Sequence, residues 1–157
     1  MEIYLDNAAT TKPDAKVIAV MNKAMKRYWA NPSSIHKKGV EAKALLEQAR
    51  KTIAESIHAL PEEIIFTSSA TEANNLAIRS LLNKKHIITS AIEHPSIMKL
   101  CKHLETEGYR VDYLSVNKEG RINLKELESS ISQETGLVTI QQINNEIGSI
   151  QDIGAIA

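Results

Sequence analysis

The chain has 157 residues, which is long enough for one compact domain with a hydrophobic core of its own. Its 19 lysines and arginines balance its 19 aspartates and glutamates, and the sequence has no basic stripe, which argues against a nucleic-acid partner. Cys101 is the only cysteine, which excludes an internal disulfide framework and any multi-cysteine zinc or iron–sulfur site formed by this chain alone.

The cysteine usage and the first residues bear on the compartment. A single cysteine is typical of a reducing environment, and we expect the cytoplasm. The N-terminal sequence MEIYLDNAATT lacks the basic and then apolar pattern of a leader, and no apolar run approaches the roughly 20 residues that cross a bilayer. We therefore predict neither export nor a membrane partner.

The first 60 residues predict two helices. Residues 3–5 form a short extended piece, and Pro13 stands where the first turn of a helix tolerates proline. The predicted helix ends near Trp29 and has apolar residues at helical spacing, namely Val17, Ile18, Met21 and Met25. A loop follows at residues 30–39. A long amphipathic helix then runs up to Pro61, with Leu45, Leu46, Ala49, Ile53 and Ile57 on its apolar face.

From residue 64 onward, strand and helix patterns alternate. The predicted strands are residues 64–67, 86–89, 110–116 and 137–143, and the predicted helices are 70–82, 96–107 and 124–131. This alternation predicts an α/β domain with a mostly parallel sheet and flanking helices. After residue 143 the sequence begins another helical pattern and stops within its first turns, so we expect a chain that is cut short.

The segment FTSSATEANN, residues 66–75, connects a predicted strand to a predicted helix. Ligands of α/β proteins gather at this end of the strands, and free N–H groups at a helix start attract phosphate. The hydroxyls of Ser68, Ser69 and Thr71 would add to such a site. Ser69 and Glu72 also form a Ser-x-x-Glu capping box, which starts a helix without any ligand. Local pattern alone favours the capping box, and neither a GxGxxG nor a GxxxxGK motif is present.

Five segments together resemble a known family. They are LDNAATT (5–11), NPSSIHKKG (31–39), TSSATEANN (67–75), IEHPS (92–96) and NNEIG (144–148). In this order and spacing, they resemble the N-terminal part of a cysteine desulfurase, a pyridoxal-phosphate enzyme of the class V aminotransferase family. The resemblance covers the whole chain. It implies the N-terminal half of a fold type I large domain at residues 16–157, with residues 1–15 belonging to the small domain.

The resemblance implies a role for each matched position. Ala70 and Thr71 would bind the phosphate of pyridoxal phosphate, His94 would stack on its ring as a catalytic residue, and Asn145 would reach its phenolic oxygen. Local sequence alone favours a helix-terminal His94 and a turn-forming Asn145, and the resemblance reverses both interpretations. Many relatives have glycine in place of Ser69. A serine suits a helix N-cap but would be strained at positive φ.

The implied reaction converts L-cysteine to L-alanine and leaves sulfur as a persulfide on an enzyme cysteine, for iron–sulfur cluster assembly or tRNA thiolation. The full-length family members would act as homodimers with a sulfur-acceptor or scaffold protein. The lysine, acid, cysteine and arginine that the reaction needs lie after NNEIG in the family, so we expect this chain alone to be inactive. Two alternatives stay open: a selenocysteine lyase fragment, or a noncatalytic accessory module that complements a desulfurase.

The remaining reactive side chains have ordinary interpretations. Four lysines are expected to be solvated and not to bind the cofactor, namely Lys37, Lys38, Lys84 and Lys85. Cys101 falls on an apolar helix face and is expected to be a small buried hydrophobe. The histidines show no metal-ligand spacing and predict no metal site: His36, His58, His86, His94 and His103. The strand at 64–67 would lack a neighbour, and the exposed edges predict poor solubility or dependence on a complementary chain.

Overall fold

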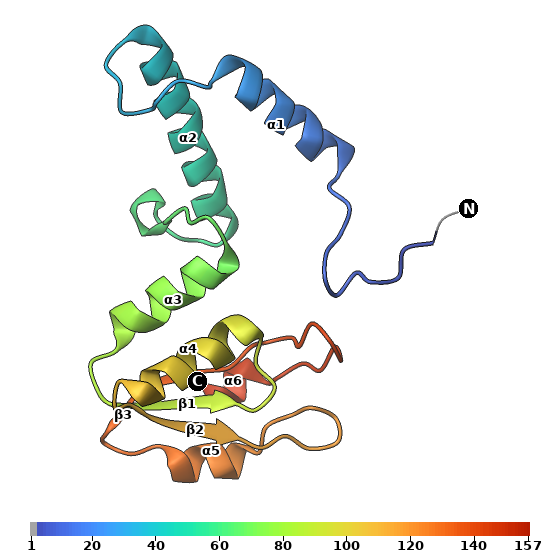
Figure 1. Ribbon diagram of the computed structural model, residues 1–157, viewed down its shortest axis with the longest axis vertical. Helices are drawn as coiled ribbons and strands as arrows, with labels where there is room; N and C mark the ends of the chain where they lie inside the picture. Colours follow the sequence, from blue (N-terminus) through green and yellow to red (C-terminus); the bar gives the residue numbers. More distant parts are fainter. Residues whose placement is uncertain (1–2) are drawn as a thin grey trace. The chain divides into compact units, whose positions relative to one another are not determined.

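The computed structural model describes residues 3–157 and divides the chain into two compact units, Met1–Phe66 and Thr67–Ala157 (Figure 1). The unit boundary coincides with the start of the segment TSSATEANN. It differs from the domain boundary predicted at residue 15, and the assignment of residues 1–15 to a small domain stays a prediction.

The first unit is helical. It contains α1 (Ala15–Arg27), α2 (Lys37–Ser56) and the short 3-10 helix η1 (Pro61–Glu63), so both predicted helices are confirmed. Asp14 caps α1 by accepting a hydrogen bond from the Lys16 N–H at 2.7 Å, and His36 caps α2 by accepting from the Gly39 N–H at 3.3 Å. Residues 3–5, predicted to be extended, lie in no strand.

The loop before α2 closes tightly on Gly39. A Cβ at this position would lie 2.3 Å from the Ser34 carbonyl oxygen and 2.9 Å from that of Asn31, so only glycine fits. The Asn31 side chain accepts from the Ser33 N–H at 2.8 Å and holds the same turn. The glycine of NPSSIHKKG therefore has a steric explanation.

The prediction of a strand at residues 64–67 is wrong, because the structure has no strand there. Ile64 has extended backbone angles, but its carbonyl accepts a hydrogen bond from the Arg50 guanidinium and not from a neighbouring strand. The guanidinium also lies 4.8 Å from the centroid of the Phe66 ring. An extended segment becomes a strand only when another strand satisfies its backbone groups. No such neighbour is present within residues 3–157.

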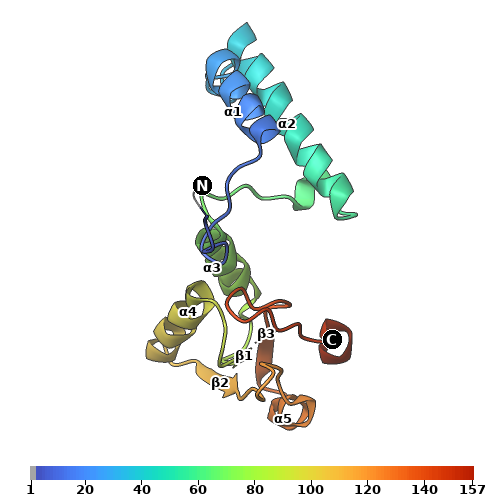
Figure 2. The same cartoon turned by 90° about the vertical axis from the view of Figure 1, so that its right-hand side faces the viewer.

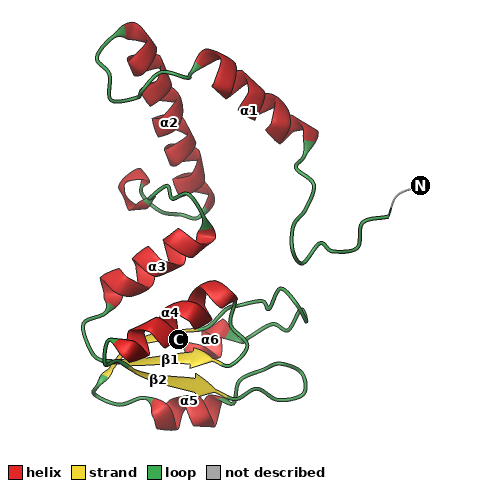
Figure 3. Cartoon of the chain, in the orientation of Figure 1, coloured by secondary structure: helices red, strands yellow, loops and turns green. Residues whose placement is uncertain are grey.

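The second unit confirms the predicted α/β class. Figure 3 shows that its strands alternate with helices. The elements are α3 (Ala70–Leu81), β1 (His86–Ser90), α4 (Pro95–Thr106), β2 (Arg110–Leu114), α5 (Leu124–Ser130), β3 (Thr135–Thr139) and α6 (Ile153–Ile156). The strands pair in parallel in the order β2-β1-β3, with β1 buried along its whole length in the centre.

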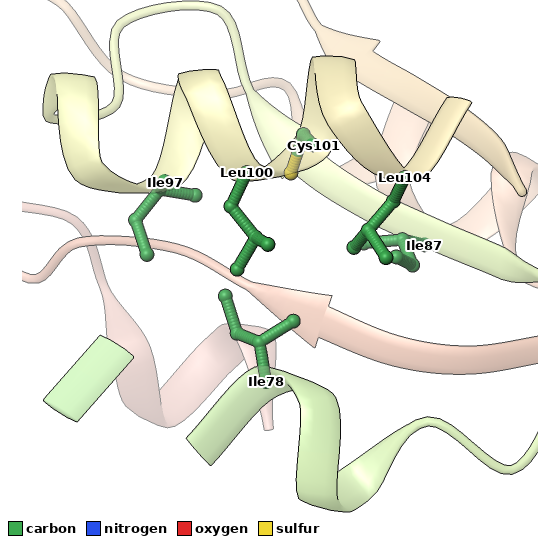
Figure 4. Close-up of a cluster of buried hydrophobic side chains, with 6 residues drawn as sticks. All are labelled: Ile78, Ile87, Ile97, Leu100, Cys101 and Leu104. Atoms are coloured by element: carbon green, nitrogen blue, oxygen red, sulfur yellow. The ribbon is translucent and has the colours of Figure 1, made fainter. Parts of the chain in front are cut away.

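Helices cover both faces of this sheet, with α4 on one side and α5 on the other (Figure 2). Neighbouring β1 residues point to opposite faces, so Ile87 packs under α3 and α4 while Ile88 packs against α5. Figure 4 shows the first of these clusters, which consists of Ile78, Ile87, Ile97, Leu100, Cys101 and Leu104. The packing fixes α3 and α4 as neighbours, and both begin near the carboxyl end of β1.

β3 ends four residues earlier than predicted, at Thr139 instead of residue 143. The Gln141 N–H does not pair with a neighbouring strand but donates to the Glu93 carboxylate at 2.8 Å. Ile143 then forms an isolated antiparallel bridge with Ile150. The apolar run continues past the strand, but its hydrogen bonds belong to the loop that follows.

A buried histidine joins the amino ends of all three strands. His86 lies 2.9 Å from the Thr135 hydroxyl through Nδ1 and 3.0 Å from the Asp112 carboxylate through Nε2. Burial by itself would raise the pKa of Asp112, but hydrogen bonds from Arg110 and His86 outweigh it and lower this pKa. This network closes the amino end of the sheet, and within the second unit the IEHPS and NNEIG segments follow the carboxyl ends of β1 and β3.

Candidate active site

The start of α3 has a single-residue cap. The Ser69 hydroxyl accepts a hydrogen bond from the Glu72 N–H at 3.2 Å, and the Ser69 carbonyl accepts from the Ala73 N–H at 3.0 Å. Ser69 has φ −164°, an extended conformation that any residue adopts. Serine in place of glycine is therefore unstrained here.

The predicted capping box forms only in part. The Glu72 carboxylate accepts from the N–H and the hydroxyl of Ser68, both at 2.6 Å, and not from the Ser69 N–H. These two bonds lower the pKa of Glu72. The Ser68 and Ser69 hydroxyls, both counted as candidate phosphate ligands, are thus already engaged.

The cap leaves several hydrogen-bond donors at the start of α3 free to bind an anion. Within residues 3–157, the N–H groups of Ala70 and Thr71 and the Thr71 hydroxyl have no hydrogen-bond partner. Unsatisfied N–H groups at the first turn carry the positive end of the helix dipole. The donor set therefore fits a phosphate, and it is narrower than the sequence suggested.

Thr71 and His94 border the same hollow. It encloses about 340 Å³ between the start of α3 and one side of α4. Its lining consists of Thr71, Asn75, His94, Pro95, Ser96, Lys99, Leu100 and His103. Two of the four predicted site residues, one from each helix start, therefore meet at one cavity, and Ala70 directly precedes Thr71.

His94 is the N-cap residue of α4. Its ring nitrogen Nδ1 lies 3.1 Å from the Ser96 backbone nitrogen and 2.8 Å from the Ser96 hydroxyl. The side chain is exposed, and Pro95 occupies the first position of the helix, where its missing N–H costs nothing. The local interpretation of His94 as a helix-terminal residue and the family role as a ring-stacking residue are thus compatible.

A buried carboxylate joins the IEHPS loop to the loop after β3. Glu93 is only 7% exposed, and its Oε1 accepts from the Ser90 hydroxyl and the Gln141 N–H, each at 2.8 Å. Burial raises the pKa of this carboxyl group. Glu93, the residue before His94, therefore ties the IEHPS loop to the carboxyl ends of β1 and β3.

Asn144 completes this junction. Its amide nitrogen donates to the Ile92 carbonyl at 2.9 Å, and its amide oxygen accepts from the Glu146 and Ile147 N–H groups at 2.9 and 3.0 Å. Asn145 is exposed, does not line the hollow, and donates to the Glu146 carboxylate at 3.2 Å. The structure thus makes Asn144 the turn former of the pair and leaves its neighbour facing solvent.

Cys101 is buried, as predicted. Its side chain is 0% exposed in the cluster between α4 and the sheet (Figure 4). Burial raises the pKa of the thiol to about 11, so the thiolate is scarce at neutral pH. This environment suits a core residue and not a nucleophile.

Two of the lysines considered earlier, Lys84 and Lys85, are not among the residues that line the hollow. Both immediately precede the amino end of β1, and the Lys85 ammonium sits 3.9 Å from the Tyr109 ring centroid. Lys99, which sequence reasoning did not single out, lines the hollow instead. No local pattern in the sequence marks this lysine as a site residue.

In the described part of the chain, no three His, Cys, Asp or Glu side chains gather closely enough to hold a metal ion. Among residues 3–157, no helix combines the length and the apolarity needed to cross a bilayer.

Nearly the whole chain matches a known protein family. The family model described as "Aminotransferase class-V" matches residues 3–157. The chain belongs to the class V aminotransferase family. The match covers both compact units and all five motifs, so the sequence resemblance is confirmed at this level.

Individual relatives are more specific. A cysteine desulfurase of a Nostoc species is 46% identical over 98% of this chain, which corresponds to 40% of the relative. A solved "NifS-like protein" gives a TM-score of 0.95 at 37% identity, over 99% of this class V chain and 44% of that one. A solved structure named "SspA in complex with cysteine" gives 0.89 at 39% identity, over 98% and 46%. The chain thus spans less than half the length of these relatives.

Proposed function

We propose that these residues form the N-terminal portion of a pyridoxal-phosphate-dependent cysteine desulfurase. The observation that carries the proposal is the pair of unsatisfied N–H groups on Ala70 and Thr71, next to a hollow that His94 also borders. Relatives with this name and one solved relative that holds cysteine support the substrate, L-cysteine. The products are L-alanine and a persulfide on an enzyme cysteine.

The residues of this chain would divide the binding of the cofactor. Pyridoxal phosphate, when bound, supplies a ring that accepts electrons as the bond to sulfur breaks. Ala70 and Thr71 would hold its phosphate, with the Lys99 ammonium as a nearby positive charge. The His94 imidazole would cover the ring, and Asn145 would turn from Glu146 to place an amide donor beside it.

Other groups needed for the reaction come from outside these residues in this proposal. A lysine that binds the cofactor covalently, an acid, a nucleophilic cysteine and an arginine for the substrate carboxylate complete the site. The 157 residues alone are therefore inactive. The complete enzyme acts as a homodimer in the reducing cytoplasm and passes sulfur to an acceptor or scaffold protein.

The phosphate site is tested with pyridoxamine 5′-phosphate, which has no aldehyde and cannot form adducts with surface lysines. Calorimetric titration should show binding to this chain, and pyridoxamine without phosphate should bind at least about tenfold more weakly, because the charged contacts are lost. Thr71→Val removes the free hydroxyl and should weaken binding about tenfold.

The matched control is Ser80→Ala. Ser80 lies on the same helix, and its hydroxyl only donates to the Ala77 carbonyl at 2.9 Å. This variant should bind as the parent chain does. Equal affinity for the phosphorylated and unphosphorylated compounds, or a Thr71→Val variant that matches the control, would refute the assigned phosphate site and favour the noncatalytic alternative.

A further inference from the structure

Three side chains on two helices form a row of hydrogen bonds beside the hollow. The Asn74 amide nitrogen on α3 donates to the Ser96 hydroxyl oxygen on α4 at 2.9 Å. The same hydroxyl lies 2.8 Å from His94 Nδ1. Ser96 is 6% exposed, so water competes little for these contacts. The row links the helix that carries the phosphate site to the imidazole.

The direction of each hydrogen bond follows from chemistry. The Ser96 backbone N–H lies 3.1 Å from His94 Nδ1, and a backbone N–H can only donate. Nδ1 must therefore accept, and a neutral imidazole that accepts through Nδ1 carries its proton on Nε2. The Asn74 amide occupies only a lone pair of the serine oxygen, so the serine O–H can donate to Nδ1 at 2.8 Å. All three bonds agree on one tautomer.

We propose that Asn74 and Ser96 are positioning residues that hold His94 in the Nε2–H tautomer, with Nδ1 facing Ser96. Within residues 3–157, no group hydrogen-bonds Nε2, so its N–H is available to a ligand in the hollow. The catalytic meaning rests on the proposed function: His94 would present a proton donor, and not a lone pair, to the bound ring and substrate.

The neighbouring carboxylate makes no hydrogen bond to the imidazole. The Glu93 carboxylate precedes His94, but its bonded oxygen is occupied by Ser90 and Gln141. No hydrogen bond joins Glu93 to the His94 ring in the described part of the chain. Serine and asparagine therefore determine the tautomer, without a carboxylate partner.

Ring nitrogen chemical shifts test the proposal directly. In the chain labelled with ¹⁵N-histidine, at about pH 8 where imidazole is ordinarily neutral, His94 should show a protonated Nε2 and an unprotonated Nδ1. The signals that disappear in His94→Gln assign the residue. A His94 protonated mainly on Nδ1 would overturn the proposal.

Variants then separate the two positioning residues. Ser96→Ala removes the hydroxyl and keeps the backbone N–H, so the ratio of Nε2–H to Nδ1–H should fall about threefold to tenfold, the worth of one hydrogen bond. Asn74→Ala should lower it about twofold, because the serine hydroxyl is then free to turn away. Ser96→Thr retains a hydroxyl and should restore the parent ratio.

The control is Ser129→Ala on α5, far from His94 in the sequence. The Ser129 hydroxyl donates to the Glu126 carbonyl at 2.9 Å. It should leave the ratio unchanged. Unchanged ratios in both Ser96→Ala and Asn74→Ala, or an equal change in the control, would refute the positioning role of Asn74 and Ser96.

The readout needs no cofactor and is therefore independent of the proposed function. A chain with the predicted tautomer that fails to bind pyridoxamine 5′-phosphate would refute the proposed function but not the positioning role of Asn74 and Ser96. A chain that binds the compound but lacks the tautomer would refute the positioning role but not the proposed function.

Discussion

At the scale of single residues, Glu93 has the most consequential environment. It is a nearly buried carboxylate between the ends of β1 and β3, with two donors on one oxygen. Burial penalises its charged form more than these donors stabilise it, and its pKa is raised. The residue before the candidate catalytic histidine thus contributes to the pH dependence of folding.

The sign of that dependence follows from the raised pKa. The folded chain keeps the Glu93 proton to a higher pH than the unfolded chain, so the stabilisation is present below the unfolded pKa, 4.5, and is lost as pH rises through the folded value. Glu93→Gln keeps an acceptor oxygen and removes the charge. We expect its free energy of unfolding at pH 7 to exceed that of the parent, because the side chain is no longer buried in a charged form.

Urea denaturation at pH 4.5 and pH 7 measures this difference, which should shrink at the lower pH. Glu128→Gln, at an exposed position of α5, is the control and should leave the stability at both values unchanged. A Glu93→Gln variant that is less stable than the parent at pH 7 would show that the carboxylate charge is favourable.

At the scale of elements, the start of α3 combines a cap with an anion site. The Ser69 hydroxyl accepts a hydrogen bond from the Glu72 N–H, and the N–H groups of Ala70 and Thr71 stay free for a ligand. The capping box and the phosphate site, two competing interpretations of the same sequence, therefore use different atoms. Each can be removed without the other.

Removing the cap should reduce stability. Ser69→Ala should lower the free energy of unfolding by about 1 kcal/mol, and Ser69→Gly by only a few tenths, because glycine leaves the helix terminus better solvated. Thermal or urea denaturation gives the order, with Ser80→Ala as the control from the same helix. An alanine variant as stable as the parent would mean that the 3.2 Å contact contributes nothing.

At the scale of the whole molecule, much apolar surface is uncovered. α1 has no buried residue, and several of its large apolar side chains are exposed: Val17, Ile18, Val20, Met21 and Met25. β2 and β3 each have one edge without a partner strand among residues 3–157. Since relatives are more than twice as long, the proposed function assigns these surfaces to the remainder of the enzyme.

A complementary chain should therefore stabilise this one. Adding the separately expressed downstream portion of a cysteine desulfurase relative should raise the melting midpoint in proportion to the logarithm of its concentration, and should reduce binding of a hydrophobic dye. An unrelated chain at equal concentration is the control. A sharp, high melting transition of this chain alone, unmoved by the partner, would contradict the expectation.

Sequence alone located most elements because the signals act over a few residues. Ser69 and Pro95 mark helix starts, and apolar spacing identified the buried face that contains Cys101. The five motifs identified the family and pointed to Thr71 and His94, which the structure brings to one hollow. These features needed no knowledge of which segments meet in space.

Only the tertiary structure decided the rest, because it depends on neighbours distant in the sequence. Residues 64–67 have a strand pattern but no partner strand, and β3 ends where the Gln141 N–H finds Glu93, 48 residues away. Asn74 and Ser96 are 22 residues apart, and no local pattern predicts their contact. Periodicity and capping fix where a helix begins, whereas hydrogen bonds between elements exist only once packing has placed α3, α4 and the strand ends together.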